Sequence, residues 1–473
     1  MAQRHPLPYA FAKAHHLLLE DDGREAVLFC AETAPSGAIA EVARLHDVSR
    51  FEREAAATLD MRIAAVYSSG GSSAATVIGE VESEVDLSRM LQDLPAVEDL
   101  LEAADDAPII RMLNALLTQA AKDGASDIHI EPYERSSSVR FRVDGTLREV
   151  VQPNRALHAA LISRLKIMAE LDIAEKRLPQ DGRISLRIGG RAIDVRVSTL
   201  PSAHGERAVL RLLDKTESKF TLEGLGMSGD VLEAFDHLVH QPHGIVLVTG
   251  PTGSGKTTTL YASLGRIDTA GTNILTIEDP IEYELAGIGQ TQVNAKIDLT
   301  YAKALRAILR QDPDVIMIGE IRDFETAQIA IQASLTGHLV LATVHTNDAP
   351  STITRLIDMG VEPFLLSSSL LGVLAQRLVR KLCEACKRQD AQNRWHPVGC
   401  TECSLTGYKG RTGVYELMVA DEAVRALVHN RAAEAEVQRV ARSGGLRSMR
   451  EDGDRLLSAG VTSLEEVLRV TRD

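Results

Sequence analysis

A glycine-rich segment that ends in lysine and threonine is the part of this sequence whose spacing most directly indicates chemistry. It fits the pattern G-x-x-x-x-G-K-[ST] with the residues Gly250, Pro251, Thr252, Gly253, Ser254, Gly255, Lys256 and Thr257. Glycines let backbone N–H groups turn toward a phosphate without interference from a Cβ atom. The lysine can bridge the β- and γ-phosphates of a nucleotide, and the threonine hydroxyl can bind Mg²⁺. The segment therefore predicts a site for a nucleoside triphosphate with Mg²⁺.

Carboxylates that such a site needs follow two apolar runs. One run, at 314–320, ends in Glu320, which would bind the metal or orient the attacking water. The other offers three acids, and Glu278 is the one that we expect to face the nucleotide. Its neighbours Asp279 and Glu282 could equally belong to a surface turn. The two runs thus predict one acid for the metal and a second beside it.

Cysteines form two close pairs in the C-terminal part of the sequence. Thirteen residues separate the two C-x-x-C pairs, which consist of Cys383, Cys386, Cys400 and Cys403. This spacing is typical of four thiolates around one tetrahedral Zn²⁺. The ion would be structural, because four protein ligands leave no position for a catalytic water. A redox pair is the alternative, although the cysteines lie outside a thioredoxin-like βαβ pattern.

Basic residues surround the first cysteine pair. They are Arg377, Arg380, Lys381, Lys387 and Arg388. They could form a solvated basic face, or they could contact anionic lipid headgroups or an acidic partner. The residues alone leave both interpretations open.

The elements that position the phosphate loop can be predicted from hydrophobic patterns. Four continuous apolar runs alternate with helical patterns and lie at 244–250, 273–279, 314–320 and 338–345. Such runs are typical of strands buried on both faces. We therefore expect an α/β fold with a largely parallel sheet between helices.

Two further segments and two histidines complete the prediction for this part of the chain. His338 and His345 flank the last apolar run, where a lone histidine is more often structural than functional. The uncharged stretch at 363–376 reads as a core helix, too short to span a bilayer. Residues 422–470 read as a helical tail.

An α+β domain is predicted upstream of these runs. Helical patterns and alternating strand patterns lie at 109–122, 126–131, 138–143, 157–171 and 183–188. In the segment 193–197 the three apolar residues would face a core, and Asp194 and Arg196 would face the other side. Arg211 lies in a similar pattern. We therefore expect the guanidinium groups of Arg196 and Arg211 to project from one small sheet.

Charge is unevenly distributed along the chain. The formal net charge is −14, and residues 80–106 carry ten acids against one base, which indicates a solvated linker with some helix. The acidic balance and the 4% aromatic content argue against a nucleic-acid-binding protein. Residues 1 to about 78 read as a small mixed domain, with a helix around 38–45 and no catalytic motif. A Ser/Gly/Ala tract at 68–75 follows. This first domain is interpreted as an interaction module.

The apolar runs at the N-terminus are too short for a signal peptide. We therefore expect a cytoplasmic protein that reaches the membrane only through a partner or a surface patch.

Four sequence blocks together resemble one family. GPTGSGKTTTLY, LTIEDPIEY, RQDPDVIMIGEIRD and TGHLVLATVHTNDA are similar to the Walker A, Asp box, Walker B and His box of the ATPases that drive type II secretion and type IV pili. The resemblance continues through SDIHIEP, FRVDGTL and GYKGRTGVYELM, over roughly residues 108–473. The N-terminal LPYAFAKAHHLLL and the short first domain are most similar to the type II secretion ATPases. Type IV pilus assembly ATPases are the alternative.

This resemblance implies an arrangement of domains. It implies a RecA-like P-loop NTPase core at 227–473, with an inserted zinc-binding segment at 381–410 and a helical part at 411–473. Before the core it implies an α+β, PAS-like domain at 108–226, an acidic linker at 80–107 and a small partner-binding domain at 1–79.

The resemblance also implies roles for single residues. ATP would bind the Walker A loop, with Glu320 as the Walker B acid and Glu278 near the metal-bound water. His338 and His345 would sense or position the γ-phosphate. Arg196 and Arg211 would act as arginine fingers that reach the γ-phosphate across a domain cleft, and Arg207 is a weaker candidate for that role.

A ring, usually a hexamer, is a further implication. Inner-membrane platform proteins would bind residues 1–107 and hold the motor at the membrane, and nucleic acid would have no part. A nucleic-acid motor and a non-hydrolysing scaffold are the competing classes. The presence of Lys256, Thr257, Glu278 and Glu320 together argues against the scaffold.

Overall fold

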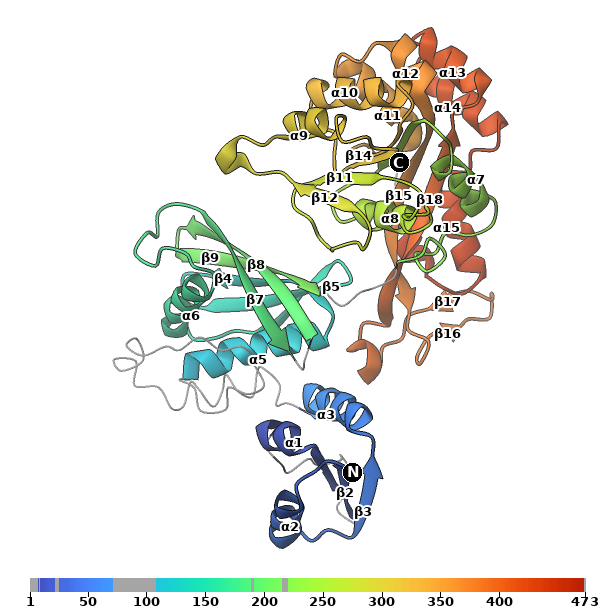
Figure 1. The fold of residues 1–473 in the computed structure, drawn as a ribbon. Coiled ribbons are helices and arrows are strands. Elements are labelled where there is room, and N and C mark those ends of the chain that lie inside the picture. The colour runs from blue at the N-terminus through green and yellow to red at the C-terminus, as the bar shows by residue number, and fades with distance from the viewer. Residues whose placement is uncertain are drawn as a thin grey trace. The chain divides into compact units, whose positions relative to one another are not determined.

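The computed structural model of the chain describes residues 7, 9–21, 25–70, 108–188, 191–214 and 220–471. They fall into two compact units, 1–216 and 217–473, drawn in Figure 1. The linker predicted at 80–107 and the end of the tract predicted at 68–75 lie outside the described residues. Within the described part, no helix combines the length and the apolar character needed to cross a membrane.

The first domain is a three-stranded sheet with three helices. Its elements are α1 (Tyr9–His15), β1 (Leu17–Asp21), β2 (Ala26–Ala31), α2 (Ser36–Leu45), β3 (Arg50–Glu54) and α3 (Ala56–Gly70). β1 and β2 are antiparallel, whereas β2 and β3 are parallel because α2 carries the chain across between them. The helix expected around 38–45 is α2. The consecutive leucines of β1 are buried in the core of this domain, and the helices that contact β1 are α1 and α3.

A six-stranded antiparallel sheet with two helices forms the second domain. Its elements are α5 (Pro108–Lys122), β4 (Ala125–Pro132), β5 (Ser137–Val143), β6 (Thr146–Val151), α6 (Arg155–Met168), β7 (Gln180–Ile188), β8 (Arg191–Ser202) and β9 (Gly205–Asp214). The strand order is β6-β5-β4-β9-β8-β7. Both helices pack on one face of this sheet, because one side chain in two along each strand is apolar (Figure 1).

The opposite face of the six-stranded sheet is polar. Val195 and Val197 point into the core as predicted, and Arg196 points away from it. Asp194 also lies on the polar face, but it is buried because Arg183 and Ser185 cover its carboxylate. The α+β character of this domain is therefore as the sequence predicts.

The second unit is built on a seven-stranded sheet of order β12-β11-β13-β14-β10-β15-β18. Its strands are β10 (Gly244–Thr249), β11 (Ile274–Glu278), β12 (Gly289–Gln292), β13 (Val315–Ile318), β14 (Leu339–Val344), β15 (Leu370–Leu382) and β18 (Tyr408–Val419). Every pairing is parallel except that of β15 with β18. The four predicted apolar runs are four of its parallel strands.

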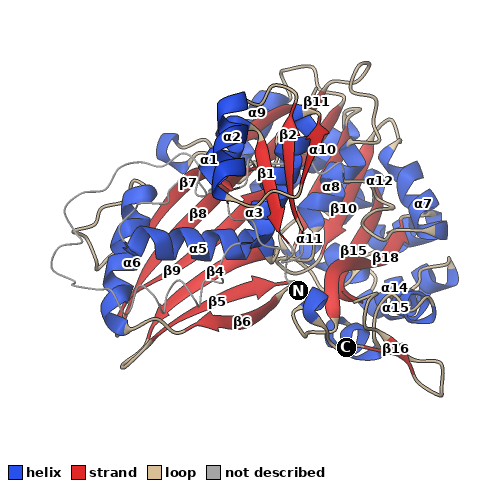
Figure 2. Cartoon of the chain, turned by 90° about the horizontal axis from the view of Figure 1, so that it is seen from below, coloured by secondary structure: helices blue, strands red, loops and turns tan. Residues whose placement is uncertain are grey.

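Helices cover both faces of this sheet (Figure 2). They are α7 (Gly229–Val239), α8 (Lys256–Leu264), α9 (Tyr301–Ile308), α10 (Phe324–Leu335), α11 (Ala349–Asp358), α12 (Pro363–Ser369), α13 (Glu422–His429), α14 (Glu434–Ser443), α15 (Met449–Ser458) and α16 (Leu464–Val470). Ile245 and Leu247 of β10 pack toward α9–α14, and Val246 and Val248 pack toward α7 and α8. The strand is apolar on both sides for this reason, and the predicted α/β fold is confirmed.

Two predictions about this unit are wrong. The stretch 363–376 is not one helix, because α12 ends at Ser369 and residues 370–376 begin β15. β15 pairs with β10 on one side and with β18 on the other, so the backbone N–H and C=O groups of β15 form hydrogen bonds with both neighbours. Residues 411–419, expected in a helical part, belong to β18. The helical tail itself is confirmed as α13–α16.

Candidate nucleotide and metal sites

The phosphate loop joins β10 to α8 and has the backbone conformation that its glycines predict. Gly250, Gly253 and Gly255 have φ angles of +148°, +80° and +88°. A Cβ atom on Gly250 would lie 2.5 Å from the Ser254 hydroxyl and 2.6 Å from the carbonyl oxygen of Gln376. Other residues would strain or clash here. Because α8 begins at Lys256, its positive N-terminus points at the loop.

Gln376, which is not among the residues predicted from the sequence, holds the loop from the side. Its Nε2 donates to the carbonyl oxygen of Ser254 at 2.7 Å, and its Oε1 accepts from the Thr259 hydroxyl at 2.8 Å. The side chain is 1% exposed. A glutamine at the end of the apolar stretch 363–376 was the signal that could have indicated this residue. Because the stretch was predicted to be a helix, nothing connected Gln376 with the loop.

Replacing Gln376 by alanine is expected to weaken nucleotide binding. The change removes both bonds and leaves two buried polar groups unsatisfied, at a cost of about 1–3 kcal/mol. If the loop carries this cost, the Kd for ATP should rise about tenfold. Titration with a fluorescent nucleotide measures the change, with the exposed Gln332→Ala as control. Equal affinity of the two variants would contradict this role of Gln376.

The carboxyl ends of neighbouring parallel strands bring the other candidates to the same edge as the loop. Glu320 lies two residues after β13, and His345 follows β14, the strand between β13 and β10. His345 Nε2 lies 3.4 Å from Glu320 Oε2. Arg322 forms an ion pair with the other oxygen of Glu320. Two predicted site residues therefore meet beside the loop.

Lys256 is close enough to Glu320 to be influenced by its charge. Its Nζ donates to the carbonyl oxygens of Gly250 at 2.8 Å and Pro251 at 3.1 Å. Burial lowers the pKa of Lys256 to about 8, the negative charge of Glu320 opposes this shift, and the positive charge of Arg377 adds to it. The two carbonyl oxygens thus hold the lysine within the loop, and Glu320 is the nearby group of opposite charge that acts on its pKa.

Glu278 ends β11 in a buried network of hydrogen bonds. Its carboxylate accepts from the Tyr261 hydroxyl, from Thr276 Oγ1 at 2.6 Å and from Gln290 Nε2 at 3.0 Å. Burial raises the pKa of Tyr261, and the bond to Glu278 raises it further. Because Tyr261 lies on α8, this network fixes Glu278 to the helix that follows the phosphate loop.

His338 does not share this edge. It precedes β14, whereas His345 follows it, so the two rings lie at opposite ends of a six-residue strand, on the order of 20 Å apart. His338 Nδ1 is 2.9 Å from the carbonyl oxygen of Ala333 at the end of α10. His338 therefore lies at the end of β14 that is remote from the loop of its own chain, and its role in sensing or positioning the γ-phosphate stays a prediction.

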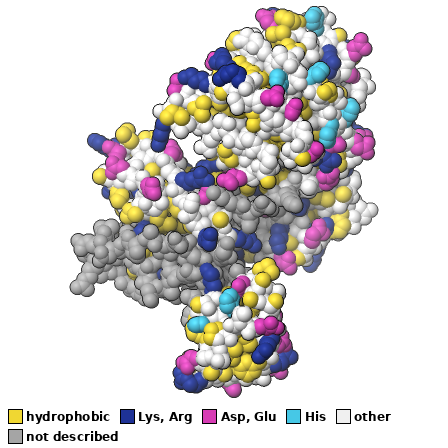
Figure 3. All heavy atoms as spheres, in the orientation of Figure 1, with side chains coloured by type: hydrophobic (Ala, Val, Ile, Leu, Met, Phe, Trp, Pro, Cys, Tyr) yellow, Lys and Arg dark blue, Asp and Glu magenta, His cyan; other side chains and the backbone are white. Residues whose placement is uncertain are grey.

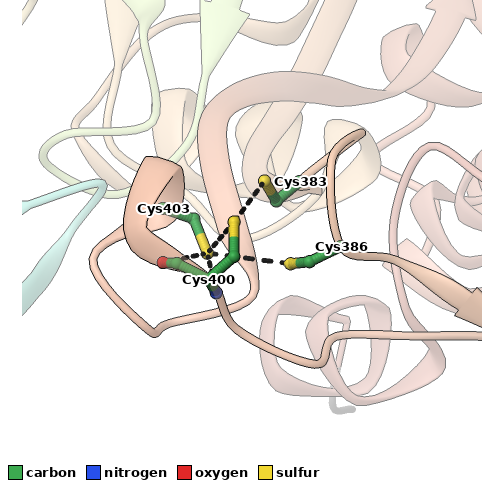
Figure 4. Close-up of side chains that lie close together, drawn as sticks. All are labelled: Cys383, Cys386, Cys400 and Cys403. Carbon is green, nitrogen blue, oxygen red and sulfur yellow. Dashed lines mark hydrogen bonds between the residues drawn. The ribbon is translucent and has the colours of Figure 1, made fainter. Parts of the chain in front are cut away.

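The four paired cysteines come together although two segments supply them (Figure 4). Their Sγ atoms all lie within 4.8 Å of one another. Cys383 and Cys400, Cys386 and Cys403, and Cys400 and Cys403 are each 3.8 Å apart. A tetrahedron with Zn–S bonds of 2.3 Å has edges of about 3.8 Å. A disulfide would need about 2.05 Å, so no disulfide is formed and the geometry fits four thiolates around one metal ion.

Backbone donors surround the cysteine sulfurs. Gly399 N–H donates to Cys386 Sγ at 3.3 Å, and the N–H groups of Cys400 and Gly407 donate to Cys403 Sγ at 3.2 Å. Burial by itself raises the pKa of Cys403, but these bonds together lower it to about 6. A thiolate, the form that binds metal, is therefore favoured at this position.

The basic residues near the first cysteine pair do not form one solvated face. Arg380 forms an ion pair with the buried Glu466 at 2.7 Å, and its guanidinium lies over the ring of Tyr408. Arg377 and Lys387 donate to backbone carbonyl oxygens, and Lys381 and Arg388 are exposed. On the visible face in Figure 3, basic, acidic and hydrophobic side chains are interspersed over residues 217–473.

Arg196 and Arg211 are direct neighbours on β8 and β9. Both point to the polar face of the six-stranded sheet, as predicted. Arg211 donates from Nε to Asp127 at 2.9 Å, and its side chain is 55% exposed. Arg207 instead uses Nη2 to bind Glu131 at 2.9 Å, so its planar fork is already engaged.

Sequence comparisons identify relatives over the whole chain. Residues 102–469 match the family described as type II/IV secretion system protein, and residues 6–67 match the model of an N-terminal domain of GSPII protein E. The type II secretion system protein HxcR of Pseudomonas aeruginosa is 63% identical over 99% of both chains. Type II secretion system protein E of Klebsiella pneumoniae is 55% identical over 99% of this chain and 98% of that protein.

Solved structures agree with these relatives. The pilus retraction motor PilT with bound ADP is 29% identical, with a TM-score of 0.53 over 76% of this chain and 96% of that chain. The Legionella pneumophila ATPase DotB shares the fold, at 22% identity and a TM-score of 0.59 over 80% of this chain and 97% of that chain. The chain therefore belongs to the type II/IV secretion system protein family, and within it to the type II secretion ATPases.

Proposed function

We propose that this chain hydrolyses ATP at the phosphate loop and uses the energy to assemble a pseudopilus for protein export by type II secretion. The observation that carries the proposal is the meeting of Glu320 and His345 at the edge of the sheet where the loop also lies. An acid, a histidine and a phosphate loop in this order of strands suit hydrolysis of a bound triphosphate.

The residues present fit ATP and Mg²⁺. Lys256 would neutralise the β- and γ-phosphates, and the hydroxyl of Thr257 and the carboxylate of Glu320 are hard oxygen ligands of the kind that Mg²⁺ prefers. When bound, Mg²⁺ would stabilise the negative charge that develops on the phosphate oxygens as the bond to the leaving ADP breaks. Glu320 would orient the attacking water, and His345, in contact with Glu320, would report the presence of the γ-phosphate. Glu278, fixed by Tyr261, would hold the same water from the side of β11.

Arg196 and Arg211 complete the proposed chemistry. As arginine fingers they would reach the γ-phosphate and neutralise the charge that grows in the transition state. Hydrolysis would then depend on how the second domain is seated on the core. This dependence would couple each hydrolysis event to a rotation of that domain.

The cysteine cluster would hold one structural Zn²⁺ and stabilise the segment 381–410. Four thiolates fill the coordination sphere, so the ion has no open position for catalysis. The segment has only two-residue strands of its own, β16 (Arg388–Gln389) and β17 (Trp395–His396). It therefore needs the metal to define its fold.

Loss of one cysteine ligand should release the zinc and destabilise this segment. Purified protein is expected to contain about one zinc per chain by elemental analysis, and Cys400→Ser to contain almost none, because metal binding supplies the folding energy. Hydrogen exchange should become fast in residues 381–410 and stay slow in β10 and β14. Cys30→Ser, outside the cluster, is the control. Zinc-free protein with a protected segment would contradict the assignment.

A homo-oligomeric ring, a hexamer in the simplest case, is the proposed working state. Residues 1–107 would attach it to inner-membrane platform proteins on the cytoplasmic side. The match of residues 6–67 to an N-terminal domain of GSPII protein E supports a dedicated module for this purpose. The module has its own buried core, so it can act as a separate binding unit.

Deleting residues 1–107 should abolish membrane association in cells and preserve ATP binding. The remaining chain keeps the whole seven-stranded sheet and the phosphate loop. Membrane sedimentation of the full and truncated proteins measures the first effect, and nucleotide titration measures the second. A truncated protein that still sediments with membranes would place the anchor elsewhere, with the exposed Lys381 and Arg388 as the first residues to change.

The response of the ATPase rate to nucleic acid distinguishes a secretion motor from a nucleic-acid translocase with a similar core. ATPase rates with and without single-stranded DNA should be equal within about twofold for a secretion motor, because the chain lacks the net positive charge that phosphate-backbone binding requires. Export of a type II substrate by cells that carry Lys256→Ala should fail. The proposal would be overturned if DNA stimulates hydrolysis by the wild-type protein and cells that carry Lys256→Ala still export the substrate normally.

A further inference from the structure

One row of directly opposed residues crosses the polar face of the six-stranded sheet. In order from β5 to β7 it contains Arg142, Asp127, Arg211, Arg196 and Arg183, each paired in register with the next. Side chains opposite each other on antiparallel strands share a face, with Cβ atoms about 5 Å apart. Four guanidinium groups and a single carboxylate therefore lie in one line.

Like charges directly opposite each other destabilise a sheet, so the carboxylates that contact such a row matter for its stability. Arg183 is neutralised from outside the row by Asp194. The opposed pair of Arg196 and Arg211 has Asp127 as the carboxylate within the row. Asp127 therefore lies where its carboxylate can set the position of the Arg211 guanidinium group.

The contact between Asp127 and Arg211 leaves the guanidinium fork free for phosphate. Asp127 Oδ1 accepts from Arg211 Nε at 2.9 Å, while Oδ2 accepts from Ser126 Oγ at 2.8 Å and lies 3.7 Å from Arg142 Nε. Asp127 is 5% exposed and lies in β4, so burial and the strand restrict the movement of its carboxylate. The Arg211 side chain is 55% exposed, and its two Nη groups are the ones that form bidentate bonds to phosphate oxygens.

We infer that Asp127 is a positioning residue that fixes Arg211 for contact with the γ-phosphate. The inference rests on the proposed function, in which Arg211 is an arginine finger. Arginine has a long side chain with several rotatable bonds, and a finger that must find its position at each turnover loses rate. Anchoring through Nε removes this search without engaging the fork.

Glu131 is a matched carboxylate on the same strand and the same face. It is 7% exposed and accepts from Arg140 Nε at 2.7 Å and from Arg207 Nη2 at 2.9 Å. Its removal also leaves two arginines without an acid, but it does not touch Arg211. Glu131→Ala therefore controls for the loss of a buried ion pair in this domain.

The test compares steady-state hydrolysis and binding of ADP–aluminium fluoride, a mimic of the transferring phosphate, in the full-length assembled protein. Asp127→Ala should lower kcat about 10- to 100-fold, keep the KM for ATP within about twofold and weaken ADP–aluminium fluoride by the same factor as kcat. Binding of ADP alone should not change. Asp127→Asn, which keeps an acceptor for Nε–H, should recover a large part of the rate, and Glu131→Ala should stay within about threefold of the wild type.

Combination with Arg211→Ala separates the inference from the proposed function. Asp127→Ala should add nothing to Arg211→Ala, because the two changes remove the same contact with phosphate. If Arg211→Ala is slow but Asp127→Ala matches Glu131→Ala, the positioning role is wrong and the finger remains. If Arg211→Ala hydrolyses at the wild-type rate, the finger itself is wrong and the inference fails with it. Melting temperatures of Asp127→Ala and Glu131→Ala that both stay close to that of the wild type exclude unfolding as the cause of a loss.

Discussion

Glu320→Gln is expected to cut ATP turnover at least about a hundredfold while the Kd for ATP changes by no more than about threefold. The amide has nearly the shape of the carboxylate, so the edge of the sheet and the loop should keep their positions. It cannot bind the metal or polarise the water as an anion can. Single-turnover hydrolysis and nucleotide titration on the same protein measure the two quantities.

Two further variants make this result specific. Glu325→Gln changes an exposed glutamate five residues away, which pairs with Arg306, and should hydrolyse ATP at the wild-type rate. His345→Ala removes the ring 3.4 Å from Glu320 and should give a smaller loss than Glu320→Gln, since it leaves the acid in place. Near-normal turnover of Glu320→Gln would show that another acid does this work, and Glu278 would be the next to test.

Arg196→Ala and Arg211→Ala are each expected to lower the ATPase rate of the assembled protein on the order of a thousandfold. Both variants should retain zinc and bind ATP, because neither residue belongs to the unit that carries the phosphate loop and the cysteines. The loss arises in the transition state, where an arginine fork neutralises growing negative charge. The ATPase rate, the zinc content and the Kd for ATP are to be measured on each variant.

Lysine should rescue these positions poorly, because an ammonium group cannot reproduce the planar fork. Arg187→Ala on β7 is the matched control, an exposed arginine of the same sheet opposite Ala192. It should hydrolyse ATP normally. Wild-type rates in both Arg196→Ala and Arg211→Ala would mean that the coupling of hydrolysis to domain rotation does not operate in this protein.

The sequence determined what local spacing can encode. Glycine positions require a particular backbone, and Gly250, Gly253 and Gly255 adopt it. Continuous apolar runs must be covered on both faces, which predicts the parallel strands of the core. Two C-x-x-C pairs suffice to indicate a tetrathiolate cluster. Alternation in 193–197 predicts the face to which Arg196 points, because a strand has a period of two residues.

Tertiary structure decided which of these residues meet. His338 and His345 look equivalent in the sequence, but a strand has two ends, and only His345 lies at the end where β10 enters the loop. The stretch 363–376 has no periodicity that separates a buried helix from a buried strand, and pairing with β10 and β18 made its second half a strand. That pairing carries Gln376 to the phosphate loop.

The same physical reason explains why the role of Asp127 cannot be predicted from the sequence, in which it is one residue of an alternating strand. Its partner Arg211 is 84 residues away along the chain. Cross-strand register is fixed by the packing of the whole core and by the turns between strands, so no local window contains it. Residue types and spacing predict which chemistry is available, whereas the register of long-range strands decides which carboxylate holds which arginine.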